Sequence, residues 1–146
     1  MPIPNLNEDG LLPEGIHDCT LEEIGAQFGR FVVSERRVRL FTQLGELVAE
    51  EQRAGIAVAV MVDGSFVTDK PEPGDIDLVI VLPADYTRGA ELPPFQYNAM
   101  SKAHMRRRYR FDVLIARQNS VEYVEALYLF QHTREGFEKG ILRIKL

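Results

Sequence analysis

The chain has few of the residues from which proteins build covalent cross-links and zinc sites. Only one of its 146 residues is a cysteine, Cys19, and none is a tryptophan. A single cysteine excludes an internal disulfide and a zinc site made of cysteines. The three histidines, His17, His104 and His132, are scattered and lack the paired spacing of a zinc-binding helix. We therefore expect each histidine to be structural or exposed, and we expect a cytoplasmic protein.

Long apolar runs and an excess of positive charge are absent as well. No apolar run approaches the roughly 20 residues that span a bilayer, and no basic segment with an apolar core opens the chain. Lysine and arginine number 17 against 22 acidic residues, which gives a net charge of −5. This balance disfavours a protein that coats nucleic acid non-specifically, although it leaves room for local basic patches. We expect no contact with a membrane.

Several common catalytic signatures are missing too. The chain has no Walker loop and no dinucleotide-binding glycine pattern, and no glycine stands two residues after Ser65, as a nucleophile elbow requires. Its most informative stretch is instead an apolar run that ends at Gly64 and Ser65, a polar loop, and a second apolar run. The second run carries Asp75 and Asp77 near its start.

This stretch predicts a metal-dependent phosphate site. Along a strand, Asp75 and Asp77 would share one face, about 6.6 Å apart at Cα, while Ile76 would point inward. That span suits two divalent ions roughly 3.5–4 Å apart. Gly64 permits a turn and a close backbone approach, and the Ser65 hydroxyl can donate to phosphate oxygens. The alternative is a simple hairpin, in which Asp75 only ends a loop.

With these residues the chain resembles the nucleotidyltransferase superfamily, the polymerase-beta-like group. That signature is an apolar residue, Gly-Ser, a short loop and Asp-apolar-Asp-apolar, which Gly64, Ser65 and the run from Asp75 to Leu78 match. Asp63, before Gly64, departs from the pattern. The resemblance implies an α+β fold in which a mixed β-sheet packs against helices on one side.

The resemblance also implies the roles of the site residues. Asp75 and Asp77 would hold two Mg²⁺ or Mn²⁺ ions, and Asp112 would hold the catalytic ion and help to activate an acceptor hydroxyl. Gly64 and Ser65 would grip the phosphates of a nucleoside triphosphate such as ATP. The alternative for Asp112 is an exposed strand-edge residue paired with a nearby arginine.

One departure concerns the loop after Ser65, where many members of the superfamily carry an arginine and this chain has none. Thr68 or Lys70 could contact the phosphates instead, but lysine lacks the bidentate fork of arginine. Small members resemble this chain in size, and some act on a separate partner protein. We therefore expect a nucleotidyltransferase whose acceptor is a protein, an RNA or a small molecule. The alternative is a catalytically impaired, antitoxin-like module that binds and regulates a partner; the oligomeric state stays open.

Positive charge gathers in residues 102–110, which include Lys102, Arg106, Arg107, Arg108 and Arg110. These cations could bind a triphosphate or a nucleic-acid acceptor, because arginine recognises phosphate through its fork. They could equally be a solvated helix face. Lys139 and Lys145 are weaker candidates for phosphate contact, and we expect them to be ordinary surface lysines.

Length and composition, with 45% hydrophobic and 27% charged residues, predict one globular domain over residues 1–146. Turn residues and apolar periodicity predict an irregular arm at 1–18, helices at 21–28, about 34–53, 96–108 and about 120–132, strands at 56–62, 76–82, 110–116 and 141–146, and a loop at 83–95. Thr20 and Glu23 have capping-box spacing, Ser34 can cap the second helix, and Gly55 should end it. In that helix the apolar residues that recur at helical spacing should be core: Val38, Phe41, Leu44, Leu47 and Val48. The last strand alternates apolar and basic residues, which is typical of a sheet edge.

Overall fold

The structure of the protein is a computed structural model that describes residues 3–87 and 91–146. The strands are β1 (Ile16–Asp18), β2 (Ala59–Asp63), β3 (Asp77–Leu82), β4 (Asp112–Arg117) and β5 (Ile141–Lys145). The helices are α1 (Leu21–Phe28), α2 (Arg36–Ala54), α3 (Pro94–Ala99), α4 (Lys102–Tyr109) and α5 (Val121–Gln131), with a short 3₁₀ helix, η1 (Ser65–Val67). Residues 1–2 of the predicted arm and 88–90 of the predicted loop at 83–95 lie outside the described residues.

The strands form one mixed sheet in the order β1-β5-β2-β3-β4. β2 runs antiparallel to β3 and β5, whereas β3 and β4 are parallel, as are β1 and β5. The predicted α+β class and mixed sheet are therefore confirmed.

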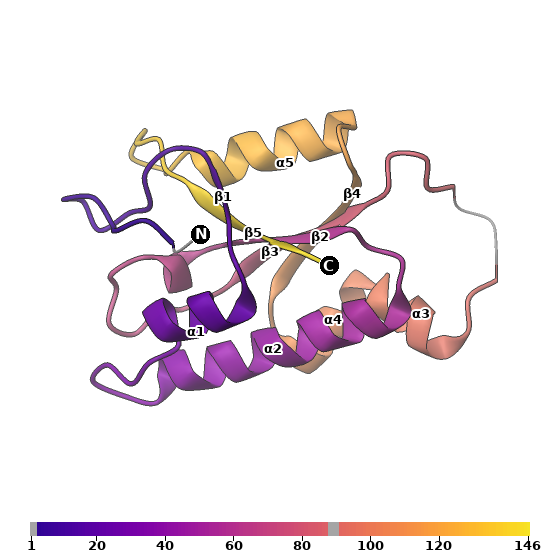
Figure 1. The fold of residues 1–146 in the computed structure, drawn as a ribbon, viewed down its shortest axis with the longest axis horizontal. Coiled ribbons are helices and arrows are strands. Elements are labelled where there is room, and N and C mark those ends of the chain that lie inside the picture. Colours follow the sequence, from indigo (N-terminus) through magenta and orange to yellow (C-terminus); the bar gives the residue numbers. More distant parts are fainter. Residues whose placement is uncertain (1–2, 88–90) are drawn as a thin grey trace.

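Helices cover both faces of the sheet (Figure 1). On one face, α1, α2 and α4 bury residues such as Leu44 and Met105 against Val60 and Ile80. On the other face, α5 packs Tyr123 and other residues against the sheet. The expectation of helices on one side holds for the first group and is wrong for α5.

The helix ends follow the sequence signals closely. Thr20 and Glu23 form the predicted capping box of α1, and Gly55 ends α2 in the left-handed conformation with φ of 68°. Ser120 caps α5 by accepting a hydrogen bond from the Tyr123 backbone N–H. Along α2 the predicted core residues Leu44, Leu47 and Val48 are buried and Phe41 is partly buried, but Val38 is exposed.

Three expectations were wrong. Ser34 does not cap α2, whose first flanking residue is Glu35; its hydroxyl accepts only from the Arg36 backbone N–H. The helix predicted at 96–108 is two helices, α3 and α4, because Ser101 begins a new one. β5 is not an edge, since β1, within the arm expected to be irregular, pairs with its outer side. Within the described residues, no helix is long and apolar enough to cross a membrane.

Candidate functional site

Three aspartates lie in a row across one end of the sheet. Asp63 ends β2 and pairs with Asp77 at the start of β3, which in turn pairs with Asp112 at the start of β4. Neighbouring strands are about 4.8 Å apart, and paired residues point to the same face. Because Met61 and Val79, two residues away, belong to the core beneath α5, the three carboxylates lie on the α5 side.

Asp75 precedes β3 and is bound to the turn at Gly64 and Ser65. Its Oδ1 accepts hydrogen bonds from the Ser65 backbone N–H at 2.9 Å and from the Ser65 hydroxyl at 2.8 Å. Gly64 has φ of 93°, and a Cβ there would lie 2.9 Å from the Asp77 nitrogen and 3.1 Å from the backbone oxygen of Asp75. Glycine is therefore needed for the turn to approach β3.

Two arginines of the first turn of α2 hold the loop between the turn and β3. Arg37 is buried and donates to the carbonyl oxygens of Phe66 and Thr68, each at 2.7 Å. Arg36 donates to the carbonyl oxygen of Gly74 at 3.0 Å. These charge-assisted bonds fix the backbone that positions Ser65 and Asp75.

The same loop contains the two predicted phosphate contacts, Thr68 and Lys70. The Thr68 hydroxyl donates to the Ser65 carbonyl oxygen at 2.6 Å, so it helps to build the turn. Lys70 is exposed. That either residue contacts phosphate stays a prediction.

Two of the row's carboxylates are paired with cations, in very different surroundings. Asp63 accepts a bond from Lys139, and their side chains are 6% and 12% exposed. Asp112 accepts a bond from Arg106 at 2.6 Å, and these side chains are 68% and 74% exposed. The first pair is largely shielded from water, whereas water can replace the second at little cost.

Asp77 lies between these pairs, and within the described residues it forms no ion pair. Burial, together with the charges of Asp75, Asp63 and Asp112, raises the pKa of Asp77 to about 6. Burial also raises the pKa of Asp63, against the opposing effect of Lys139. Among the described residues, the centre of the row therefore carries negative charge that no ion pair compensates.

A cavity of about 390 Å³ opens beside Asp77 and Asp112. Lys102 and Arg106, both from α4, line it together with apolar side chains that include Phe111.

A second cavity, of about 280 Å³, opens beside Asp75, and Phe111 lines it as well. Arg36 and Arg39 of α2 and Arg110, which ends α4, line this cavity. Asp75 thus lines one cavity and Asp77 and Asp112 line the other, and each cavity carries positive charge.

Among the described residues, no group of three or more carboxylate, histidine or cysteine side chains is arranged to hold a metal ion as it stands. The hydrogen bonds explain why, because Asp75 is turned toward Ser65 and Asp112 toward Arg106. Carboxylate oxygens are nevertheless the donors that Mg²⁺ and Mn²⁺ prefer. The carboxylate oxygens of Asp77 and Asp112 would therefore suit these ions, provided that Arg106 moved away from Asp112.

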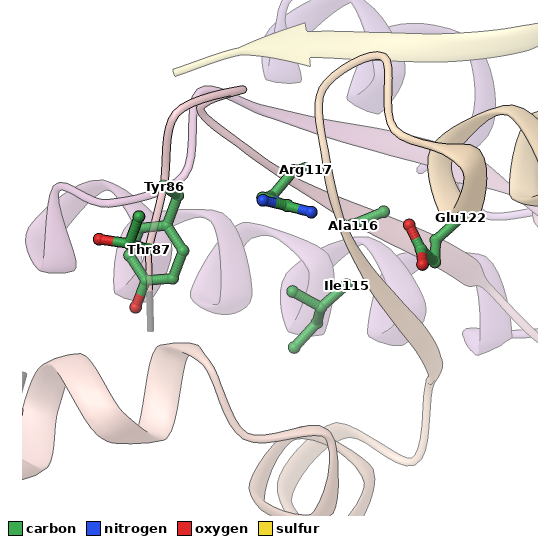
Figure 2. Close-up of a pocket in the computed structure, with 6 residues that line it drawn as sticks. All are labelled: Tyr86, Thr87, Ile115, Ala116, Arg117 and Glu122. Carbon is green, nitrogen blue, oxygen red and sulfur yellow. The ribbon is translucent and has the colours of Figure 1, made fainter. Parts of the chain in front are cut away.

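The opposite end of the sheet, where β3 and β4 finish, also has a cavity, of about 460 Å³ (Figure 2). Its lining includes Tyr86, Ile115, Arg117 and Glu122. Among the described residues that line it are one cation, Arg117, and one carboxylate, Glu122.

A family model matches residues 4–145, and its description is "Family of unknown function (DUF6932)". The chain belongs to this family. The matched residues include Asp63, Asp77 and Asp112, the turn at Gly64, and the residues that line the cavities of about 390 and 280 Å³. No curated protein and no solved structure matches the chain.

The sequence alone does not place two residues at this site. Asp63 departs from the pattern that precedes Gly64, and Lys139 is not the ordinary surface lysine that the sequence suggests, because its side chain is 12% exposed and paired with Asp63. The signal for Asp63 was its place at the end of an apolar strand, directly before Gly64. Lys139 has no local signal, because 76 residues separate it from Asp63.

Proposed function

We propose that this DUF6932 protein is a Mg²⁺-dependent nucleotidyltransferase that transfers a nucleoside monophosphate from a nucleoside triphosphate to a hydroxyl acceptor. The observation that carries the proposal is the row of Asp63, Asp77 and Asp112, with Asp75 anchored beside it by Ser65. Clustered carboxylates repel one another and destabilise a fold unless a cation compensates them. A purely structural sheet end has no need of such a cluster.

Within this proposal, Asp75, Asp77 and Asp112 would hold the metal ions. The ions would neutralise charge on the phosphates as the transfer proceeds. Asp63 is a poor additional ligand, because it is buried and already paired with Lys139. The ion pair of Asp63 with Lys139 instead holds the end of β2 in place, directly before the turn at Gly64.

The reaction is a substitution at the α-phosphorus. The acceptor oxygen forms a bond to that phosphorus, and the bond to the oxygen that bridges the α- and β-phosphates breaks, so that pyrophosphate leaves with the bond's electron pair. The proton of the acceptor hydroxyl passes to Asp112, which lines an open cavity and is two-thirds exposed. Asp112 can reach this role once Arg106 has turned away.

A second candidate function is a non-catalytic module of the same ancestry that binds and regulates a partner. Two observations favour it: the hydroxyl of Ser65 is already bound to Asp75, and the carboxylates are not arranged to hold an ion as they stand. The loop after Ser65 also lacks an arginine that would contact the terminal phosphate.

One experiment separates the two candidates. The purified protein is incubated with each of the four α-³²P-labelled nucleoside triphosphates, Mg²⁺ or Mn²⁺, and pools of RNA, protein and small-molecule acceptors. Transfer of label that requires a divalent ion and is lost in Asp77→Asn supports the enzyme. Absence of transfer, with no metal-dependent binding of nucleotide by calorimetry, supports the regulatory module.

A further inference from the structure

The carboxylates have exposed cations on both sides, although the protein as a whole is acidic. Arg36, Arg39 and Arg110 line the cavity beside Asp75, and Lys102 and Arg106 line the cavity beside Asp112. A net charge of −5 makes such a concentration of cations around one site unexpected. A cluster of this kind attracts phosphate groups.

Two of these cations stand where they weaken the fold. Arg39 lies in the first turns of α2, close to its positive end, where a cation is unfavourable. Arg110 ends α4 with φ of 61°, a conformation that glycine adopts freely and arginine adopts at a cost of about 1 kcal/mol. Within the described residues, neither guanidinium forms a hydrogen bond or an ion pair. Residues that break local rules in this way are expected at binding sites.

The cations are more numerous and more widely spread than a single triphosphate tail would need. A triphosphate tail would occupy one cavity, and the cations of the other cavity would then remain uncompensated. A chain of phosphodiesters could follow both cavities, since Phe111 lines each of them, Asp75 lines one, and Asp77 and Asp112 line the other.

We propose that this basic track, defined as Lys102, Arg106, Arg36, Arg39 and Arg110, binds the backbone of a single-stranded nucleic acid whose terminal hydroxyl is the acceptor. The inference rests on the proposed function and names its acceptor class. A backbone phosphate near Arg106 would compete with Asp112 for the guanidinium, and it would thereby free the carboxylate that the reaction needs. Acceptor binding and readiness for catalysis would then be coupled.

The test measures binding without catalysis. Fluorescence anisotropy in EDTA follows a fluorescein-labelled ten-nucleotide single-stranded RNA, and DNA of the same sequence, over a range of salt concentrations. We expect binding at low salt, and we expect the double variant Arg39→Gln/Arg110→Gln to weaken it about tenfold and to reduce the salt slope by about 1.4, at about 0.7 for each phosphate contact of a single strand. Lys102→Gln should reduce the slope by about half as much.

The matched control is Arg53→Gln/Arg117→Gln, which removes the same charge. Arg53 is 14 residues from Arg39 along α2, or about 21 Å, and Arg117 lies at the opposite end of β4 from Asp112. In about 0.1 M salt, where the Debye length is about 10 Å, the control should retain wild-type affinity to within about twofold, because its charges lie farther away than that.

A further variant, Arg110→Gly, guards against a loss of binding through misfolding. It should unfold at the same or a higher temperature than the wild type and still bind RNA more weakly. The inference is overturned if neither oligonucleotide binds, if the control pair weakens binding as much as the track pair, or if inorganic tripolyphosphate binds to the track and the oligonucleotides do not. Metal-dependent nucleotide binding that persists in any of these cases leaves the proposed function standing.

Discussion

The two ends of the sheet differ in charge far more than in shape. Where β3 and β4 begin, Asp77 and Asp112 lie beside cavities of about 390 and 280 Å³. Where the same strands finish, the described residues that line a cavity of about 460 Å³ include one cation, Arg117, and one carboxylate, Glu122 (Figure 2). Volume therefore does not distinguish the ends; among the described residues, the first end gathers Asp63, Asp75, Asp77 and Asp112 with cations around them, and the second has no such cluster.

The largest expected difference between the ends is in activity. If the proposed function holds, Asp77→Asn should lower the rate of nucleotide transfer by about 10³-fold, or about 4 kcal/mol, because it removes a carboxylate of the proposed metal site. Glu122→Gln, the same chemical change at the other end, should leave the rate within about twofold, since it touches no reacting group. Steady-state kinetics of both variants measure the contrast, and equal losses would remove the distinction between the ends.

The next largest effect concerns the buried pair of Asp63 and Lys139. Lys139→Met should lower the free energy of unfolding by about 3 kcal/mol, because it leaves a buried carboxylate without its cation. Adding Asp63→Asn should restore most of that loss. Urea titrations measure both variants. Arg117→Met at the opposite end should change the free energy by less than about 0.5 kcal/mol, and a similar loss there would contradict the account.

A smaller effect is expected from the turn. Gly64→Ala would place a Cβ 2.9 Å from the Asp77 nitrogen at φ of 93°, so it should cost about 2 kcal/mol of stability and lower activity as β3 shifts. Gly74→Ala in the same loop meets nothing within 4 Å and is the control. Thermal unfolding of the two variants would show equal stability if the close approach at Gly64 were unimportant.

The smallest effect is a dependence on pH in the absence of metal. The pKa of Asp77 is raised from 3.8 to about 6, so the folded protein binds a proton that the unfolded chain releases, and stability falls as pH rises from about 4 to 6. After allowance for solvent screening, Asp77→Asn should therefore gain about 1 kcal/mol at pH 8 in EDTA and almost nothing at pH 4. Asp85→Asn, an exposed residue beyond the end of β3, should gain nothing at either pH. Calorimetric melting at the two pH values decides the outcome.

The parts of this fold that were predicted correctly are those that local sequence determines. The capping box of α1, the stop at Gly55 and the strands that carry Asp77 and Asp112 depend on residues close in sequence, to within a few positions at the ends. The closeness of Asp77 to Asp112 followed from the resemblance.

The parts that were missed depend on pairing between distant segments. β5 lies inside the sheet because three residues of the arm, Ile16–Asp18, pair with its outer side. Lys139 is part of the site because the chain returns to Asp63 after 76 residues. Periodicity within a segment carries no information about such partners.

The proposed function requires above all that the carboxylate end of the sheet bind divalent ions together with nucleotide. Electron paramagnetic resonance of Mn²⁺, titrated into the protein with a non-hydrolysable ATP analogue, tests this directly. We predict two bound ions for each wild-type chain, and loss of that binding in Asp77→Asn but not in Glu122→Gln. Mn²⁺ that stays free in the wild type, or that binds Asp77→Asn equally well, would contradict the claim.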